Sequence, residues 1–131
     1  MHIHNPLELN NKFLHLECLN SLITSLVLLN LFPLKKNLEK LKYIKSKIRN
    51  NKSLDTIFFI FTKISKYLSI NKCLTTSFAL FRVLKIYGYS PKLYIGIKKE
   101  KDFNSHAWLE CNDRKFFFSH SEEYIKIFEI K

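Results

Sequence analysis

A cysteine and a histidine in the second half of the chain are residue types that carry out nucleophilic catalysis. Cys73 stands at the start of a helical pattern, NKCLTTSFALFRVLKIY, and His106 opens a strand pattern, HAWLEC. The unpaired N–H groups of a helix's first turn, together with an imidazolium, can lower the pKa of a thiol and activate it. His106 and Trp108 would share one face of their strand. These residues predict a Cys–His pair, and the alternative is that both are structural, as a small buried thiol usually is.

The helices that would position Cys73 follow from the spacing of the apolar residues. Recurrence at helical spacing predicts four helices, over residues 8–31, 35–49, 53–68 and 73–87. Pro33 would end the first helix, Ser53 would cap the third, and Gly88 would close the fourth. The second helix carries lysines around an apolar stripe and is therefore basic and amphipathic.

The strands that would position His106 begin after Pro91, where the apolar period changes to alternation. Three strands are expected, over residues 92–99, 106–111 and 114–120. Asn112 and Asp113 form a hairpin-turn dipeptide between the last two strands. The final segment, EEYIKIFEIK, fits a strand or a helix. Helices followed by a small antiparallel sheet predict an α+β fold, and without repeats or linkers we expect one domain, 1–131.

The composition is that of a folded, strongly basic protein. The 131 residues are 47% hydrophobic, and the formal net charge is +11. Such a charge suggests nucleic acid, an anionic membrane surface or an acidic peptide as a partner, or simply a solvated lysine surface. No arginine cluster or aromatic RNA-binding motif accompanies it, so we expect no nucleic acid partner. The apolar run 18–34 is too short and too polar for a transmembrane helix, which favours a buried or membrane-apposed one and leaves a membrane-surface contact open.

The cysteine count indicates a reducing compartment. The three cysteines, Cys18, Cys73 and Cys111, are odd in number and form no C-x-x-C pair. Cys18 lies among leucines and is expected to be inert core, and Cys111 has no evident activator. Histidine and cysteine spacing does not favour zinc. The start of the chain lacks the basic segment of a signal peptide, so we expect a cytoplasmic protein, with membrane association left open.

Several motifs together resemble a known family. They are the Cys-Leu-Thr start at Cys73, the Ser77, Ala79 and Leu80 continuation, the Gly-Tyr close, the YIGIKK strand and the HAWLE strand. This string, over about residues 71–120, resembles the core of the lasso-peptide leader peptidases, the microcin-processing family of transglutaminase-like cysteine proteases. The helices before it, in residues 1–70, also fit the general layout of that family.

The resemblance implies a transglutaminase/papain-like core and a peptidase that removes the leader from a ribosomally made precursor. Cys73 would attack the scissile carbonyl, with His106 as base and then acid, and backbone N–H groups would form the oxyanion hole. The enzyme would need no cofactor of its own. Its implied partners are the precursor peptide, a separate leader-recognition protein and an asparagine-synthetase-like cyclase that uses ATP. The basic helix 35–49 would be a docking surface, a membrane-facing surface or a solvated face.

The sequence departs from this family at the third catalytic position, where relatives carry an acid on the next strand. With a two-residue turn, Leu109 would pair with Phe116, which brings Ser119 opposite His106. The expected acid position therefore holds Phe118 or Ser119, and neither is acidic.

Three explanations remain open for the missing acid. Ser119 would orient the imidazole as a weaker third member, or a bulge would bring Glu110 or another acid into range, or the protein would be impaired and act as a binding partner for the precursor or cyclase. A protein of a different functional class, a basic helical protein that binds nucleic acid or a membrane, would account only for the net charge.

Overall fold

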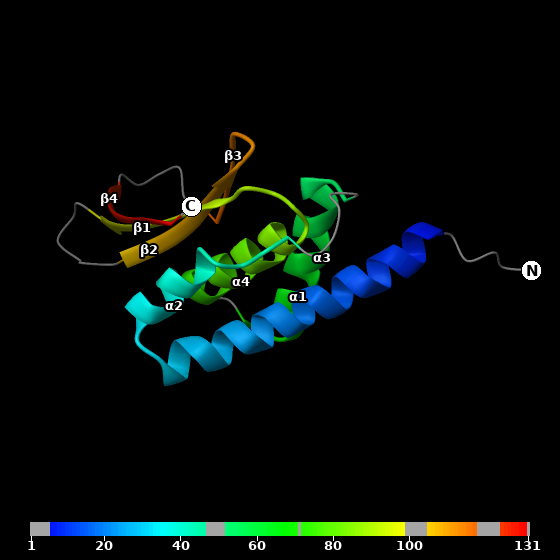
Figure 1. The fold of residues 1–131 in the computed structure, drawn as a ribbon, viewed down its shortest axis with the longest axis horizontal. Helices are drawn as coiled ribbons and strands as arrows, with labels where there is room; N and C mark the ends of the chain where they lie inside the picture. Colours follow the sequence, from blue (N-terminus) through cyan, green and yellow to red (C-terminus); the bar gives the residue numbers. More distant parts are fainter. Residues whose placement is uncertain (1–5, 47–51, 71, 99–104, 118–123, 131) are drawn as a thin grey trace, which may run out of the picture.

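The computed structural model describes residues 6–46, 52–70, 72–98, 105–117 and 124–130 (Figure 1). The helices precede the strands, as the sequence predicts. They are α1 (Pro6–Leu31), α2 (Leu34–Leu41), α3 (Leu54–Tyr67) and α4 (Cys73–Ile86), followed by β1 (Lys92–Lys98), β2 (Ser105–Cys111), β3 (Arg114–Phe116) and β4 (Tyr124–Ile130).

The first helix ends where predicted, but the second is much shorter than predicted. Pro33 separates α1 from α2, and α2 stops at Leu41 rather than continuing to residue 49. The N–H groups of Lys42 and Tyr43 bond to carbonyls only three residues back, at 3.3 and 3.1 Å, which is the tight turn that ends many helices. Lysines follow one another closely through this segment, and like charges three and four residues apart destabilise a helix. Residues 47–49 lie outside the described part of the chain.

The third and fourth helices begin and end as predicted. The Ser53 hydroxyl accepts a hydrogen bond from the Thr56 N–H at 3.2 Å, so it caps α3. Asp55 lies in the first turn of α3, where the helix dipole favours a negative charge. Cys73 is the first residue of α4, and Gly88, with a φ of 89°, follows the end of this helix in the left-handed conformation that glycine adopts readily.

The strands form one antiparallel sheet in the order β3-β2-β1-β4. Asn112 and Asp113 have φ values of 50° and 64°, as a two-residue hairpin turn requires, and Leu109 pairs with Phe116 as predicted. The C-terminal segment, whose sequence fitted a strand or a helix, is the strand β4, and it pairs with β1. The strand predicted over 114–120 ends earlier, because Phe117 has a φ of 65° and leaves the ladder; residues 118–120, and hence Ser119, lie outside the described residues.

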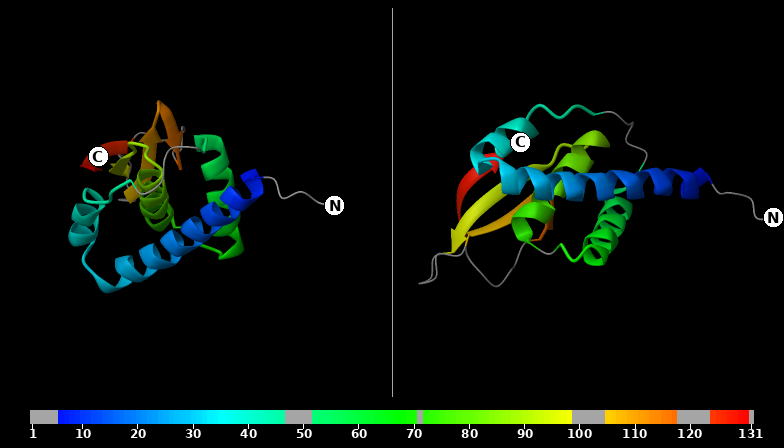
Figure 2. Two further views of the ribbon diagram at one scale, coloured as in Figure 1. Left: turned by 45° about the vertical axis from the view of Figure 1, so that its right-hand side comes forward. Right: turned by 90° about the horizontal axis from the view of Figure 1, so that it is seen from below.

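The helix that carries Cys73, α4, lies between α1 and the sheet (Figure 2). The Ser21 hydroxyl of α1 donates to the Ala79 carbonyl at 2.7 Å, and on the other side of α4 the Ser77 hydroxyl donates to the Ala107 carbonyl of β2 at 3.3 Å. Phe78, Phe81 and Leu84 of α4 are fully buried or nearly so. This packing places the start of α4 beside the start of β2.

Candidate active site

Cys73 occupies the position that nucleophilic chemistry requires, at the open end of a helix. It is half-buried, and Lys72, the residue before it, forms no side-chain cap on the first turn among the described residues. The Thr76 hydroxyl donates to the Lys72 carbonyl at 2.9 Å, so it does not occupy the N–H groups of that turn. Those N–H groups point out of the helix end and are suited to bind a negatively charged oxygen.

Burial raises the pKa of the Cys73 thiol above its ordinary value, and a hydrogen bond from its own backbone N–H offsets only part of that effect. These surroundings favour the protonated thiol, and activation of Cys73 by the helix N-terminus stays a prediction. A protonated thiol needs a group that removes its proton during attack.

The other two cysteines are unsuited to this role. Cys18 is fully buried in α1, and burial, followed by the nearby Glu17, raises the pKa of its thiol to about 12. Cys111 is also buried, which raises the pKa of its thiol. All three thiols are free. Cys73 is thus the thiol that a substrate can reach.

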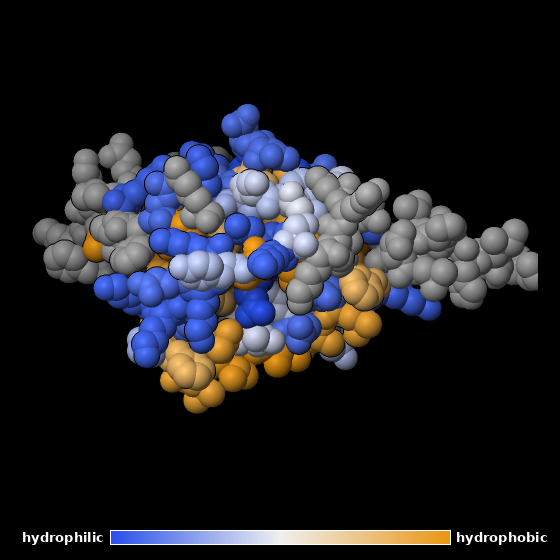
Figure 3. Space-filling model, viewed as in Figure 1, coloured by the Kyte–Doolittle hydropathy of each residue, from blue (hydrophilic) through white to orange (hydrophobic). Residues whose placement is uncertain are grey.

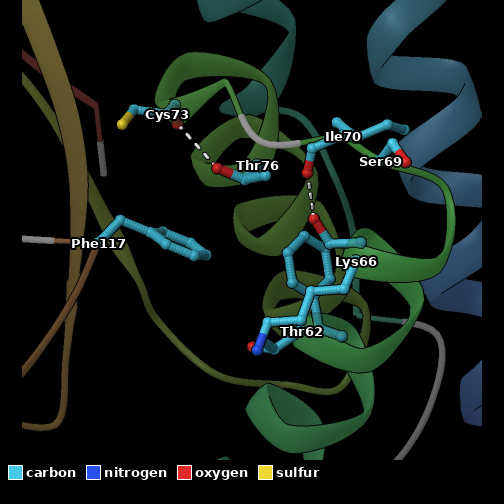
Figure 4. Close-up of a pocket in the computed structure, with 9 residues that line it drawn as sticks. Thr62, Lys66, Ser69, Ile70, Cys73, Thr76 and Phe117 are labelled. Carbon is cyan, nitrogen blue, oxygen red and sulfur yellow. Dashed lines mark hydrogen bonds between the residues drawn. The ribbon is translucent and has the colours of Figure 1, made fainter.

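A cavity of about 390 Å³ lies in front of Cys73. Figure 4 shows the sulfur on the side of the cavity from which the Phe117 ring extends inward. The walls come from the end of α3, the segment after it, the start of α4 and the residue after β3: Phe61, Thr62, Ser65, Lys66, Ser69, Ile70, Cys73, Thr76 and Phe117. The cavity is therefore apolar at its aromatic wall and hydroxyl-rich on the helical side.

His106 is held by a backbone carbonyl. It is half-buried, and its Nε2 lies 2.5 Å from the Phe117 carbonyl oxygen. A carbonyl oxygen only accepts hydrogen bonds, so Nε2 must carry the proton, and the neutral ring has its basic lone pair on Nδ1.

An aromatic stack supports the imidazole on its strand. The Trp108 ring lies nearly parallel to it, with centroids 6.3 Å apart, which confirms that the two side chains share one face of β2. Tyr94 of β1 stacks on Trp108 at 5.6 Å. Gly96 is the residue of β1 directly opposite His106, so no side chain stands beside the ring at that position.

Phe117 links the two predicted catalytic residues. It lines the cavity in front of Cys73, and its carbonyl holds His106. Its ring packs against Phe58 and Phe61 of α3, at centroid distances of 5.6 and 6.3 Å. In the described part of the chain no hydrogen bond joins the Cys73 thiol to His106, and what relates the two residues is Phe117, which shares a cavity with Cys73 and holds His106 through its carbonyl.

The acid that relatives carry is not supplied by Glu110. The pairing of β2 with β1 is regular from Ser105 to Glu110, so no bulge moves this carboxylate toward the imidazole. Four residues of strand separate Glu110 from His106 by about 13 Å. Its carboxylate instead lies 3.7 Å from the Lys126 ammonium. Ser119 and Phe118 lie outside the described residues, so Ser119 as third member stays a prediction.

Comparison with known proteins assigns the family. A family model described as the transglutaminase-like superfamily matches residues 16–128, which include Cys73 and His106. The chain belongs to the transglutaminase-like superfamily. No curated protein and no solved structure gives a significant match. The four helices followed by a four-stranded antiparallel sheet are thus a transglutaminase-like core.

Membership in the transglutaminase-like superfamily agrees with the site described above. An accessible thiol at a helix start without a side-chain cap, together with an imidazole whose tautomer is fixed by Phe117, is an arrangement suited to acyl transfer through a thioester. The sequence predicted Cys73 and His106 as catalytic residues from their positions, and their roles stay predictions. Sequence reasoning missed Phe117 and Gly96, because neither a left-handed backbone angle at Phe117 nor the strand opposite His106 can be read from the local pattern.

Proposed function

We propose that this protein is a cysteine peptidase that removes the leader from a ribosomally synthesised lasso-peptide precursor. The observation that carries the proposal is Cys73, a half-exposed thiol in a cavity whose wall residue Phe117 also holds His106. The membership in the transglutaminase-like superfamily supports thiol chemistry. The Cys-Leu-Thr and HAWLE motifs support the finer choice of a leader peptidase.

The proposed reaction begins with a neutral thiol. As Sγ of Cys73 attacks the scissile carbonyl, Nδ1 of His106 takes the thiol proton, and the first-turn N–H groups of α4 stabilise the oxyanion. Collapse breaks the C–N bond, and the imidazolium returns the proton to the leaving amine of the core peptide. Water, deprotonated by His106, then hydrolyses the thioester to release the leader. The imidazole must approach the thiol during this cycle, because such contacts often tighten only when substrate is bound.

In this proposal the Phe117 carbonyl performs the orienting part of the role that the resemblance gives to an acid. It fixes the tautomer of His106, as an acid would, but it is neutral and stabilises the imidazolium less. The carbonyl is therefore expected to support slower catalysis than a carboxylate in the same place would.

The proposed setting is a cytoplasmic maturation pathway. The partners would be the precursor peptide, a separate leader-recognition protein and an asparagine-synthetase-like cyclase. The cyclase would use ATP to join the new amine to a side-chain carboxylate, and the peptidase itself would need no cofactor.

The test is precursor cleavage followed by mass spectrometry, with the recognition protein and cyclase supplied. Wild type should release the leader, whereas Cys73→Ala and His106→Ala should lose at least about a thousandfold in rate. Ser90→Ala, an exposed hydroxyl away from the cavity, is the control. Unchanged cleavage by Cys73→Ala would refute the proposal.

One observation favours a second candidate, a non-catalytic protein that binds the precursor or the cyclase through the same cavity. Burial raises the pKa of the Cys73 thiol, which disfavours a resting nucleophile, and the Glu110 carboxylate lies 3.7 Å from the Lys126 ammonium. In that case wild type would leave the precursor intact, and Cys73→Ala would bind it as tightly as wild type does.

A further inference from the structure

The outer face of α1 is apolar and exposed. The exposed fractions of its outward side chains are large: Phe13 51%, Leu16 64%, Ile23 47%, Val27 48% and Leu31 70%. At 100° per residue these side chains fall on one stripe, which we call the α1 stripe. Figure 3 shows it as an apolar strip along the edge of the molecule that α1 forms. Asn20 and Thr24 lie on or next to this stripe, and the apolar side chains around them form an exposed patch of the kind that marks an interaction site.

The opposite face of α1 is buried in the core of the protein. Leu14, Cys18 and Leu22 are fully buried against the rest of the core, and Ser21 is hydrogen-bonded to α4. The helix is thus largely apolar on both sides, with Asn20, Thr24 and Asn30 as polar residues toward water, although a surface helix ordinarily presents a mainly polar face. The exposed apolar side chains of the α1 stripe are suited to contact with a partner surface.

The length and composition of α1 are compatible with contact to lipid. Its stretch Lys12–Leu31 is long and apolar enough to cross a membrane, and only 28% of it is buried, whereas the core helix of a soluble protein is mostly buried. If α1 crossed a membrane, its inner face would have to leave the core of the protein. A helix lying in the plane of the membrane surface satisfies both faces.

The charges around the stripe indicate which lipid surface it fits. Lys12 stands at one end, and exposed Lys35 and Lys36 follow the other end. An almost entirely apolar groove of about 600 Å³ runs between α1 and α3, and its lining includes Lys63 and Lys66. With a net charge of +11, this apolar surface edged by ammonium groups matches acyl chains beneath anionic headgroups.

We propose that the α1 stripe docks this protein on an anionic bilayer surface, with α1 parallel to the membrane plane. The proposal is independent of the peptidase reaction, because the stripe lies on the side of the core away from the sheet. The α1 stripe itself includes no residue of the cavity, although Lys66, which lines the groove beside the stripe, also lines the cavity.

The experiment is flotation of the full-length protein with vesicles of phosphatidylcholine alone and of phosphatidylcholine with phosphatidylglycerol. Wild type should float with the anionic vesicles, bind the neutral ones far less, and be released as salt is raised. Ile23→Glu should weaken binding about tenfold or more, since it replaces an inserted side chain by a charge. Ser90→Glu changes the net charge equally at an exposed site on the loop before β1, and should bind like wild type apart from a small electrostatic loss.

Two results would overturn the proposal. One is that wild type fails to float with anionic vesicles, or that Ile23→Glu floats as well as Ser90→Glu. The other is that light scattering shows a stable dimer which Ile23→Glu converts to a monomer, because the stripe would then be an interface between two copies of the chain.

Discussion

At the scale of single residues, the chemistry depends on where the thiol proton resides before attack. Cys73 is half-buried, and burial raises the pKa of its thiol. A resting thiolate–imidazolium pair would require the opposite shift. The structure thus favours a base that acts during attack, which is how a neutral hydroxyl is activated in serine enzymes.

This leads to a prediction for alkylation of the native protein. The iodoacetamide rate should rise with pH and reach half its maximum above 9.0, the ordinary value for the thiol, because the folded site favours the protonated form. Mass spectrometry should find Cys73 modified first, since Cys18 and Cys111 are buried.

The matched variants for alkylation are His106→Ala and Cys73→Ala. The first should leave the midpoint unchanged, and the second should abolish the fast phase. A wild-type rate that is already maximal at neutral pH, and that collapses in His106→Ala, would instead show a resting ion pair.

The second prediction concerns Phe117, a positioning residue. Phe117→Ala removes the ring contacts with Phe58 and Phe61, so its carbonyl should lose its fixed place on His106. We expect kcat to fall about tenfold with little change in KM, and Phe117→Tyr to restore it.

The ¹⁵N shifts of His106 provide a readout for Phe117 that does not depend on catalysis. In wild type they should report a neutral ring protonated on Nε2, and in Phe117→Ala a mixture of the two tautomers. A wild-type ring protonated on Nδ1 would contradict the assignment even if the protein cleaves its substrate.

At the scale of elements, α1 has two apolar faces that differ in what they contribute to folding. Leu22 is fully buried and Ile23, the next residue, is 47% exposed. Leu22→Ala should lower the free energy of unfolding by about 3 kcal/mol, because it leaves a cavity in the core. Ile23→Ala should change it by less than about 0.5 kcal/mol.

Chemical denaturation of these two variants measures the difference directly. Equal losses of unfolding free energy in the two variants would mean that the face of α1 that carries Ile23 is packed against the rest of the chain. That result would remove the basis for a docking surface on α1.

Periodicity and capping residues were sufficient to predict most of the elements. Ser53, Pro33 and Gly88 marked helix ends correctly because each acts through its own backbone or side chain. The second helix was predicted too long because the prediction used only the spacing of its apolar residues. That spacing carries no information on the repulsion among neighbouring lysines. The C-terminal strand was undecided because pairing with β1, far away in the sequence, determines its conformation.

At the scale of the whole molecule, α4 connects the helical layer to the sheet. One side is fixed to α1 through Ser21, and the other to β2 through Ser77. This arrangement places the first residue of α4 and the start of β2 at one end of the molecule. The apolar stripe of α1 lies on the other side of α4, and Lys66 lines both the groove beside the stripe and the Cys73 cavity.

The residue types of the candidate site were predictable from the sequence, but the way in which Phe117 links them was not. Cys73 and His106 were identified from element boundaries, which local sequence encodes. The link through Phe117 depends on a left-handed residue just after a strand, which no local pattern in an aromatic run reveals. The family match over residues 16–128 supports the thiol chemistry but does not name a substrate.

The most direct test of the central claim is trapping of the thioester. Precursor is incubated with this protein and its proposed partners in the presence of hydroxylamine, and the mass of the leader is measured by mass spectrometry. A thioester on Cys73 predicts a leader carrying a hydroxamate at its new C-terminus, and an acylated protein whose modification maps to Cys73. Both products should be absent for Cys73→Ala. Release of the leader only as the free acid, with no adduct on Cys73 at any time, would contradict the account.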